Sequence, residues 1–148
     1  MKKPAAAVAS WCTFRLDGRL YGVAVERVQE VLGSAEIAPL PLSPPAVRGL
    51  VNLRGQIVTA LDLRTCLGIP GSAPERAAHV VIADASAPIS LLVDSIGDVA
   101  RTAPGVLYPA PETLNARGRD LLQGAAPLSG DLLWILDLDR VLEAAFAT

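Results

Sequence analysis

The sequence predicts a mainly β protein whose second half repeats the plan of the first. Short apolar, β-prone runs recur along the chain with Gly-, Pro- and Asp-containing connections between them, a pattern typical of strands joined by turns. Two pairs of segments also match in the same order in the two halves. With 148 residues, 51% of them hydrophobic, the chain can bury the core of one domain or of two small barrels around a common interior.

The first elements are predicted to form a β-hairpin. Residues 11–16 and 20–25 are the strands, and Asp17-Gly18-Arg19 is the Gly-containing connection. Apolar residues then recur at i, i+3 and i+4 within residues 28–32. This spacing predicts a short helix, which Gly33 would end.

A stiff connector and a second hairpin follow. Residues 39–45 read PLPLSPP, and their prolines lack the backbone donor that a central strand requires. The segment is either a rigid crossing between two elements or a PxxP ligand for another domain, and the crossing is the simpler interpretation. Strands are predicted at residues 47–51 and 56–61, on either side of Asn52-Leu53-Arg54-Gly55.

The middle of the chain contains a short helix and a predicted internal boundary. Asp62 is expected to cap a helix at residues 63–67 by accepting hydrogen bonds from free amide groups. Residues 68–75 read GIPGSAPE, and most of these residues are typical of turns and loops. We therefore place an approximate boundary between two subdomains near residues 68–77.

Beyond this boundary the plan begins again. The second half is predicted to contain two strands, a long Pro-rich loop, a final strand and a C-terminal helix. In that order, these elements fall at residues 80–83, 89–93, 104–111, 132–136 and 138–146.

Two segment pairs indicate a duplication. Residues 25–31 and 93–99 share the pattern V-acid-x-[VI]-x-acid-V. Residues 61–67 and 136–142 each place a strand end, a capping Asp and an apolar helix face at the same spacing. Matches in the same order predict a duplicated β unit.

Composition excludes several classes of protein. The formal net charge of -2 gives no general attraction to nucleic acid or to anionic lipid. Every hydrophobic run is broken before the roughly 18 residues that a transmembrane helix needs. Residues 1–10 are expected to be a disordered leader, because Pro4 interrupts an apolar stretch too short for a signal peptide. Cys12 and Cys66 lack metal-ligand spacing and are predicted to be buried, reduced thiols of a cytosolic protein.

The sequence offers little for catalysis. His79 is the one histidine, it lies beside a predicted strand, and no G-x-S-x-G elbow or phosphate-binding glycine loop occurs. Asp62, Asp94 and Asp137 fall where strands pass into helices or turns, so accepting backbone hydrogen bonds explains them. We therefore expect no catalytic residues, no metal and no cofactor.

Arg54 stands apart from these residues. It lies at a Gly-containing turn between two apolar strands. It is either an ordinary hairpin arginine or an interface anchor, because the guanidinium is a rigid five-donor group enriched at the energetic centres of interfaces. The residues alone leave both interpretations open.

Several segments resemble the CheW family of chemotaxis coupling proteins. The most specific is a G-x-x-N-L-R-G turn followed by a strand that ends in Asp62-Leu63. A V-x-E-V segment, a V-D-x-[VI]-x-D-V segment and a proline stretch occur in the family's order, and the likeness runs from about Trp11 to about Leu142. The matching segments are residues 28–31, 49–55, 56–63, 93–99 and 109–112.

The resemblance implies two five-stranded, SH3-like β-barrels that share a hydrophobic core, with short helices that include one at the C-terminus. Residues 11–148 would then be a single domain of two barrel subdomains. It implies a scaffold without catalytic activity whose partners are the regulatory domain of the histidine kinase CheA and the cytoplasmic tip of a methyl-accepting receptor. No nucleic acid, membrane insertion or small-molecule substrate is implied. The protein would be cytoplasmic and recruited to membrane-associated receptor arrays.

Carried over by motif, the residues on or near these partner surfaces are Val28, Glu30, Gly49, Asn52, Arg54, Gly55, Ile96 and Val99. This sequence departs from the family at Thr59, Ser90 and the Arg117-Gly118-Arg119 loop. The departures leave open a sister adaptor for surface (type IV pilus) motility or second-messenger control. A small ligand-binding barrel or enzyme is the alternative from another class, and it would need a pocket with convergent polar groups.

Overall fold

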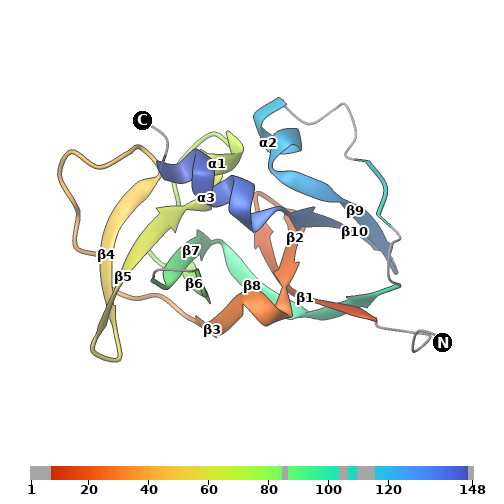
Figure 1. Cartoon of the computed structure of the whole chain (residues 1–148), viewed down its shortest axis with the longest axis horizontal. Helices are drawn as coiled ribbons and strands as arrows, with labels where there is room; N and C mark the ends of the chain where they lie inside the picture. Colours follow the sequence, from red (N-terminus) through yellow and green to blue (C-terminus); the bar gives the residue numbers. More distant parts are fainter. Residues whose placement is uncertain (1–7, 85–86, 104–106, 110–115, 147–148) are drawn as a thin grey trace.

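The computed structural model describes residues 8–84, 87–103, 107–109 and 116–146, which form two five-stranded sheets (Figure 1). Sheet A has the order β8-β1-β2-β10-β9, and sheet B has the order β3-β6-β7-β5-β4. Short helices lie between or after the strands, with α3 at the C-terminal end. The predicted mainly β fold with two five-stranded sheets is confirmed, while closure of each sheet into a barrel stays a prediction.

The bounds of the elements are as follows. Sheet A contains β1 (Ala9–Leu16), β2 (Arg19–Ala24), β8 (Ser95–Thr102), β9 (Leu122–Leu128) and β10 (Asp131–Leu136). Sheet B contains β3 (Val28–Leu32), β4 (Val47–Leu53), β5 (Gln56–Asp62), β6 (Ala78–Ile82) and β7 (Ile89–Val93). The helices are η1 (Val25–Arg27), α1 (Leu63–Leu67), α2 (Ala116–Asp120) and α3 (Leu138–Phe146).

The duplication is present in the structure at the level of strand register. The first unit runs from β1 to α1, and the second runs from β6 to α3. Val28 pairs with Ile82 in sheet B as Ile96 pairs with Phe14 in sheet A. The parallel pairs correspond too, because Thr59 lies opposite Ile89 as Trp134 lies opposite Tyr21. The predicted repeat is therefore confirmed.

The two units exchange strands. Sheet A combines β1 and β2 of the first unit with β8, β9 and β10 of the second, and sheet B combines the remaining strands. Residues 68–77 thus mark where the repeat begins again, but they join α1 to β6 within sheet B. The predicted boundary is wrong as a division between subdomains, because turn-forming residues show where the chain bends and carry no information about which strands pair.

The core lies mainly between the sheets. The largest buried cluster includes Phe14 and Trp134 from sheet A, Leu61 and Ile82 from sheet B, and Val141 from α3. Two smaller clusters lie apart from it, one around Val51, Ala60 and Leu92 and one around Leu20, Leu133 and Ile135. Since alternate residues of a strand point to opposite faces, each sheet buries one face in the shared core and the other in its own cluster.

Several local predictions are confirmed. Asp17 and Gly18 have positive φ angles of 52° and 79° and turn the first hairpin, as a two-residue primed turn requires. Asp62 caps α1, because its Oδ1 accepts a hydrogen bond from the Arg64 amide at 3.1 Å. The proline segment 39–45 contains no strand and crosses from β3 to β4. The predicted loop at residues 104–111 lies largely outside the described residues.

Other local predictions are wrong. Residues 28–32 form strand β3, in which half-buried and exposed residues alternate, because pairing with β6 overrides a helical spacing of only three apolar residues. Strands β8 and β9 and helix α2 were not predicted. Residue 8 begins the described chain and β1 begins at Ala9, two residues before the predicted strand; the remainder of the predicted leader lies outside the described residues.

Ion pairs hold both points where the chain passes between sheets. Where β7 leads to β8, Arg64 of α1 donates to Asp94 at 2.7 Å. Where β2 leads through η1 to β3, Arg27 pairs with Asp139 of α3 at 3.3 Å. Each crossing is thus joined by an ion pair to a helix, α1 in one case and α3 in the other. In the first pair the helix provides the base, and in the second it provides the acid.

The one histidine is buried inside sheet B. Its Nδ1 lies 2.7 Å from the hydroxyl oxygen of Ser90 on the neighbouring strand β7. Burial disfavours the charged imidazolium and lowers the pKa of His79 below its usual value. The ring is therefore neutral at physiological pH.

This burial predicts an acid-sensitive stability. Because the folded-state pKa of His79 is lowered, the unfolded chain binds more protons below its own pKa of about 6.5. The contribution is fully present above that pH and is lost as the pH falls below it. Urea unfolding between pH 7.5 and 5.5 should show a decline in stability that His79→Gln reduces. An equally steep decline in the variant would contradict the assignment to His79.

Candidate protein-interaction surface

The turn between β4 and β5 presents Arg54 to solvent. Arg54 and Gly55 both have positive φ angles, 55° and 84°, which the tight turn requires. The Asn52 side chain fixes this turn, since its Oδ1 accepts a hydrogen bond from the Gly55 amide at 3.0 Å. The Arg54 side chain is 85% exposed.

Arg54 forms an ion pair with Glu30, which lies at the other edge of sheet B. Nη2 of Arg54 lies 3.6 Å from Oε1 of Glu30, which is in β3. Strands β3 and β4 are opposite edges of the sheet, so this contact shows that the sheet curls until its two edges approach. We call this approach of β3 to the β4–β5 turn the sheet B seam. Both residues were predicted from the sequence to lie at a partner surface, and the structure brings them together.

The repeat provides an internal comparison for Arg54. The β9–β10 turn corresponds to the β4–β5 turn, because Leu128 pairs with Asp131 as Leu53 pairs with Gln56. Ser129 therefore stands in the second unit where Arg54 stands in the first. A hairpin at this point of the fold does not require an arginine.

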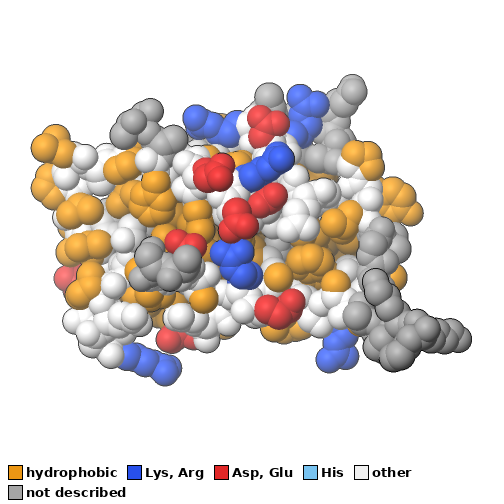
Figure 2. All heavy atoms as spheres, in the orientation of Figure 1, with side chains coloured by type: hydrophobic (Ala, Val, Ile, Leu, Met, Phe, Trp, Pro, Cys, Tyr) orange, Lys and Arg blue, Asp and Glu red, His pale blue; other side chains and the backbone are white. Residues whose placement is uncertain are grey.

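A groove beside the turn adds apolar surface. It has a volume of about 460 Å³, and its lining includes Leu50, Asn52 and Ile57. Ile57 is 58% exposed. Hydrophobic side chains gather at the left of Figure 2, the end of the molecule that carries β4 and β5. Ile57 was missed from the sequence, although its alternation with buried Val58 could have indicated an outward face.

The remaining predicted site residues are dispersed. Val28 is half-buried against the shared core, and Gly55 is exposed in the turn. Ile96 and Val99 are exposed on β8, in the other sheet. Glu30, Asn52 and Arg54 therefore lie together on sheet B, whereas Ile96 and Val99 lie on sheet A.

Gly49 is buried and does not reach the surface. Its φ angle is 150°, and a Cβ there would overlap the carbonyl oxygen of Ala38, whose backbone pairs with Leu50. Gly124 occupies the corresponding place in the second unit, with a φ of 158° and a hypothetical Cβ 2.7 Å from the Tyr108 oxygen. The close approach is thus a property of the repeated fold, and it explains Gly49 without a partner.

Substitution at the two glycines near Arg54 should distinguish backbone strain alone, at Gly55, from strain combined with a steric overlap, at Gly49. Gly49→Ala should destabilise the protein by about 2–4 kcal/mol, because the backbone of Ala38 must move. Gly55→Ala, where nothing lies within 4 Å of the added atom, should cost about 1 kcal/mol of strain. Denaturant midpoints measure both. Equal losses would contradict the close-approach argument.

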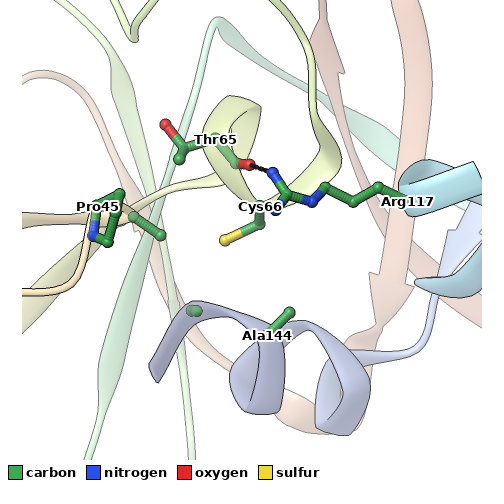
Figure 3. Close-up of a pocket in the computed structure, with 7 residues that line it drawn as sticks. Pro45, Thr65, Cys66, Arg117 and Ala144 are labelled. Carbon is green, nitrogen blue, oxygen red and sulfur yellow. Dashed lines mark hydrogen bonds between the residues drawn. The ribbon is translucent and has the colours of Figure 1, made fainter. Parts of the chain in front are cut away.

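A second cavity, of about 370 Å³, lies between α1, α3 and the residues before β4 (Figure 3). Cys66 points its sulfur toward this cavity, and Arg117 reaches across from α2 to donate a hydrogen bond to the Thr65 carbonyl oxygen at 3.4 Å. Burial raises the pKa of the Cys66 thiol to about 11, so the thiol stays protonated and is a poor nucleophile. The lining is completed by Pro45, Ala46, Ala144 and Ala145, and it contains no acid–base pair.

The raised thiol pKa predicts slow alkylation. In a Cys12→Ser background, Cys66 should react with iodoacetamide at pH 8 about 100-fold more slowly than an unfolded control, because a pKa near 11 lowers the thiolate fraction by two orders of magnitude. Mass spectrometry of the timed reaction provides the rate. Native and urea-unfolded protein reacting at the same rate would contradict it.

Two further observations bear on catalytic and metal sites. His79 and Ser90 are hydrogen-bonded but fully buried, and the pairing was not predicted from the sequence. Within the part of the chain that the structure describes, no group of three or more His, Cys, Asp or Glu side chains is placed to hold a metal ion. None of the described helices has the length and apolar content needed to cross a bilayer.

Comparison with known proteins identifies a family for this chain. The model of the CheW-like domain matches residues 10–146. "Chemotaxis protein CheW" of Klebsiella aerogenes is 28% identical over 132 residues, covering 88% of this chain and 80% of that protein. The protein of the same name from Rhizobium meliloti is 26% identical, covering 86% and 83%. The crystal structure of the scaffolding protein TtCheW from Thermoanaerobacter tengcongensis shares the fold, with a TM-score of 0.79 at 24% identity over 92% and 93% of the chains.

Proposed function

The chain belongs to the CheW-like domain family, and from that premise we propose that it is a non-enzymatic adaptor that couples methyl-accepting chemoreceptors to the histidine kinase CheA. The observation that carries this proposal is Arg54, which is exposed at a hairpin tip and held by a single long contact to Glu30. The fold does not require an arginine there, since Ser129 serves at the corresponding turn.

The chemistry of the surface suits a protein partner. A guanidinium offers five donors in one plane and is enriched among residues that dominate binding energy. The groove lined by Leu50 and Ile57 lies beside it and adds apolar area that a partner can cover. A charged anchor next to an apolar groove supports recognition of a protein surface rather than of a small metabolite.

The existing ion pair is easily exchanged. An exposed pair at 3.6 Å contributes only about 0–1 kcal/mol to stability. Arg54 can therefore leave Glu30 for a carboxylate of the partner at little cost, and Glu30 can accept a donor in return. The adaptor would act through binding alone: receptor and kinase are held in one assembly, and the state of the first biases the activity of the second. Such an assembly would keep the protein in the cytoplasm, at membrane-associated receptor arrays.

Pull-down of partners tests this role. Arg54→Ala should reduce capture of the kinase and receptor from the host lysate at least tenfold, and Arg54→Asp should reduce it further by reversing the charge. Arg76→Ala, which removes an exposed arginine from a loop before β6, is the matched control. Circular dichroism should show both Arg54 variants folded. Unchanged capture by a folded Arg54→Asp protein would overturn the proposal.

The identity of the co-purified kinase distinguishes two pathways. A kinase of flagellar chemotaxis supports the adaptor proposed here. A kinase of a surface-motility or second-messenger pathway would assign the same surface to a sister system.

A further inference from the structure

The repeat places an acidic residue in sheet A where sheet B has the Arg54–Glu30 pair. Asp98 of β8 corresponds to Glu30 of β3, because Val31 lies opposite Val80 as Val99 lies opposite Cys12. The next correspondence is at the turns, where Ser129 replaces Arg54. A serine side chain cannot span the distance that the longer arginine side chain spans in sheet B. The acid of the second unit therefore lacks the cation that its counterpart has.

The structure shows a groove at this position. It has a volume of about 330 Å³, and residues of β8 and of the β9–β10 turn line it, Asp98, Val99 and Ser129 among them. We call it the sheet A seam. Leu20, Ala100 and Leu128 provide apolar walls, which suit the methylene stem of a long cationic side chain.

The groove carries one uncompensated charge. Asp131 also lines it, but Arg15 donates to that carboxylate at 2.7 Å, and this hydrogen bond lowers the pKa of Asp131. Arg15 also donates a hydrogen bond to the Gly18 carbonyl oxygen at 3.2 Å. The Asp98 carboxylate makes no ion pair or side-chain hydrogen bond with any residue that the structure describes, whereas its backbone oxygen accepts one from the Thr13 hydroxyl. The remaining charge in the sheet A seam is therefore negative.

We propose that the sheet A seam is a docking site for an arginine side chain of a partner protein, which pairs with Asp98 as Arg54 pairs with Glu30 in the sheet B seam. The internal repeat is the template, because the same fold position already holds a guanidinium beside an acid. The exposed Val99, 58% accessible, borders the site and adds apolar contact. Asp98 is the residue that selects a cation at this end of the molecule.

The site can be filled from within the chain. Ser129→Arg places an arginine where the first unit has Arg54, and it should raise the melting temperature by about 1–3 °C through pairing with Asp98. The gain should vanish when Asp98→Asn is added. A gain that persists in the double variant, or no gain with the wild-type Asp98, would show that the groove does not accept a guanidinium.

The site can also be filled from outside. Titration of the ¹⁵N-labelled chain with N-acetyl-arginine amide should produce concentration-dependent shifts at residues 97–100 and at Ser129 and Gly130. N-acetyl-citrulline amide, which is nearly isosteric and uncharged, should produce none. Asp98→Asn and Ser129→Arg should each abolish the shifts, whereas Glu143→Gln on the exposed face of α3, with the same loss of charge, should preserve them. Equal responses to arginine and citrulline would overturn the proposal.

A measurement of self-association tests whether a second copy of this chain occupies the sheet A seam. Arg54 of a second copy could enter the same groove, and sedimentation would then show a concentration-dependent oligomer that both Arg54→Ala and Asp98→Asn abolish. That result would overturn the assignment to a separate protein. The amino-acid titration requires no kinase or receptor, so its failure is distinguishable from failure of the coupling function.

Discussion

The exchange of strands between the two repeats is the constraint on which the rest of the structure depends. Because β8, β9 and β10 complete the sheet that β1 and β2 begin, neither unit has a full sheet of its own. The crossings must hold their positions for the shared core to close, and the Arg64–Asp94 and Arg27–Asp139 pairs lie at those crossings. The apolar cluster between the sheets then draws residues from both units. The two sheets are therefore expected to unfold as one cooperative unit.

Comparison of the repeats separates what the fold needs from what it leaves free. Gly49 and Gly124 both allow a close backbone approach, and Asp62 and Asp137 both accept amide hydrogen bonds at the start of a helix. These features recur because the same backbone path requires them. Arg54 and Ser129 differ although their turns correspond. Such differences are where one unit can take on a binding role without loss of the common fold.

The turns and caps could be predicted from local chemistry, whereas the pairing of strands across the sheets could not. The Asp17-Gly18 turn and the Asp62 cap each depend on neighbours in sequence, and both could be predicted. Residues 28–32 were misread because a strand with one half-buried face can match helical spacing over so short a stretch. β8 was missed because most of its residues are exposed, which leaves no hydrophobic alternation to detect. The Glu30–Arg54 contact joins two edges of a curled sheet, and no sequence pattern reports that curvature.

The ion pair at a crossing between the sheets is more buried than the ion pair at the β4–β5 turn. The Arg64 side chain is 16% exposed and Asp94 is 26% exposed, and their atoms lie 2.7 Å apart. Water screens this pair poorly, so breaking it would leave a half-desolvated charge, which suits a fixed crossing. Arg54 is exposed and 3.6 Å from Glu30, so water can replace either partner with little change in free energy. An adaptor must hold its own fold while it exchanges partners at its surface, and this division between buried and exposed charge pairs permits both.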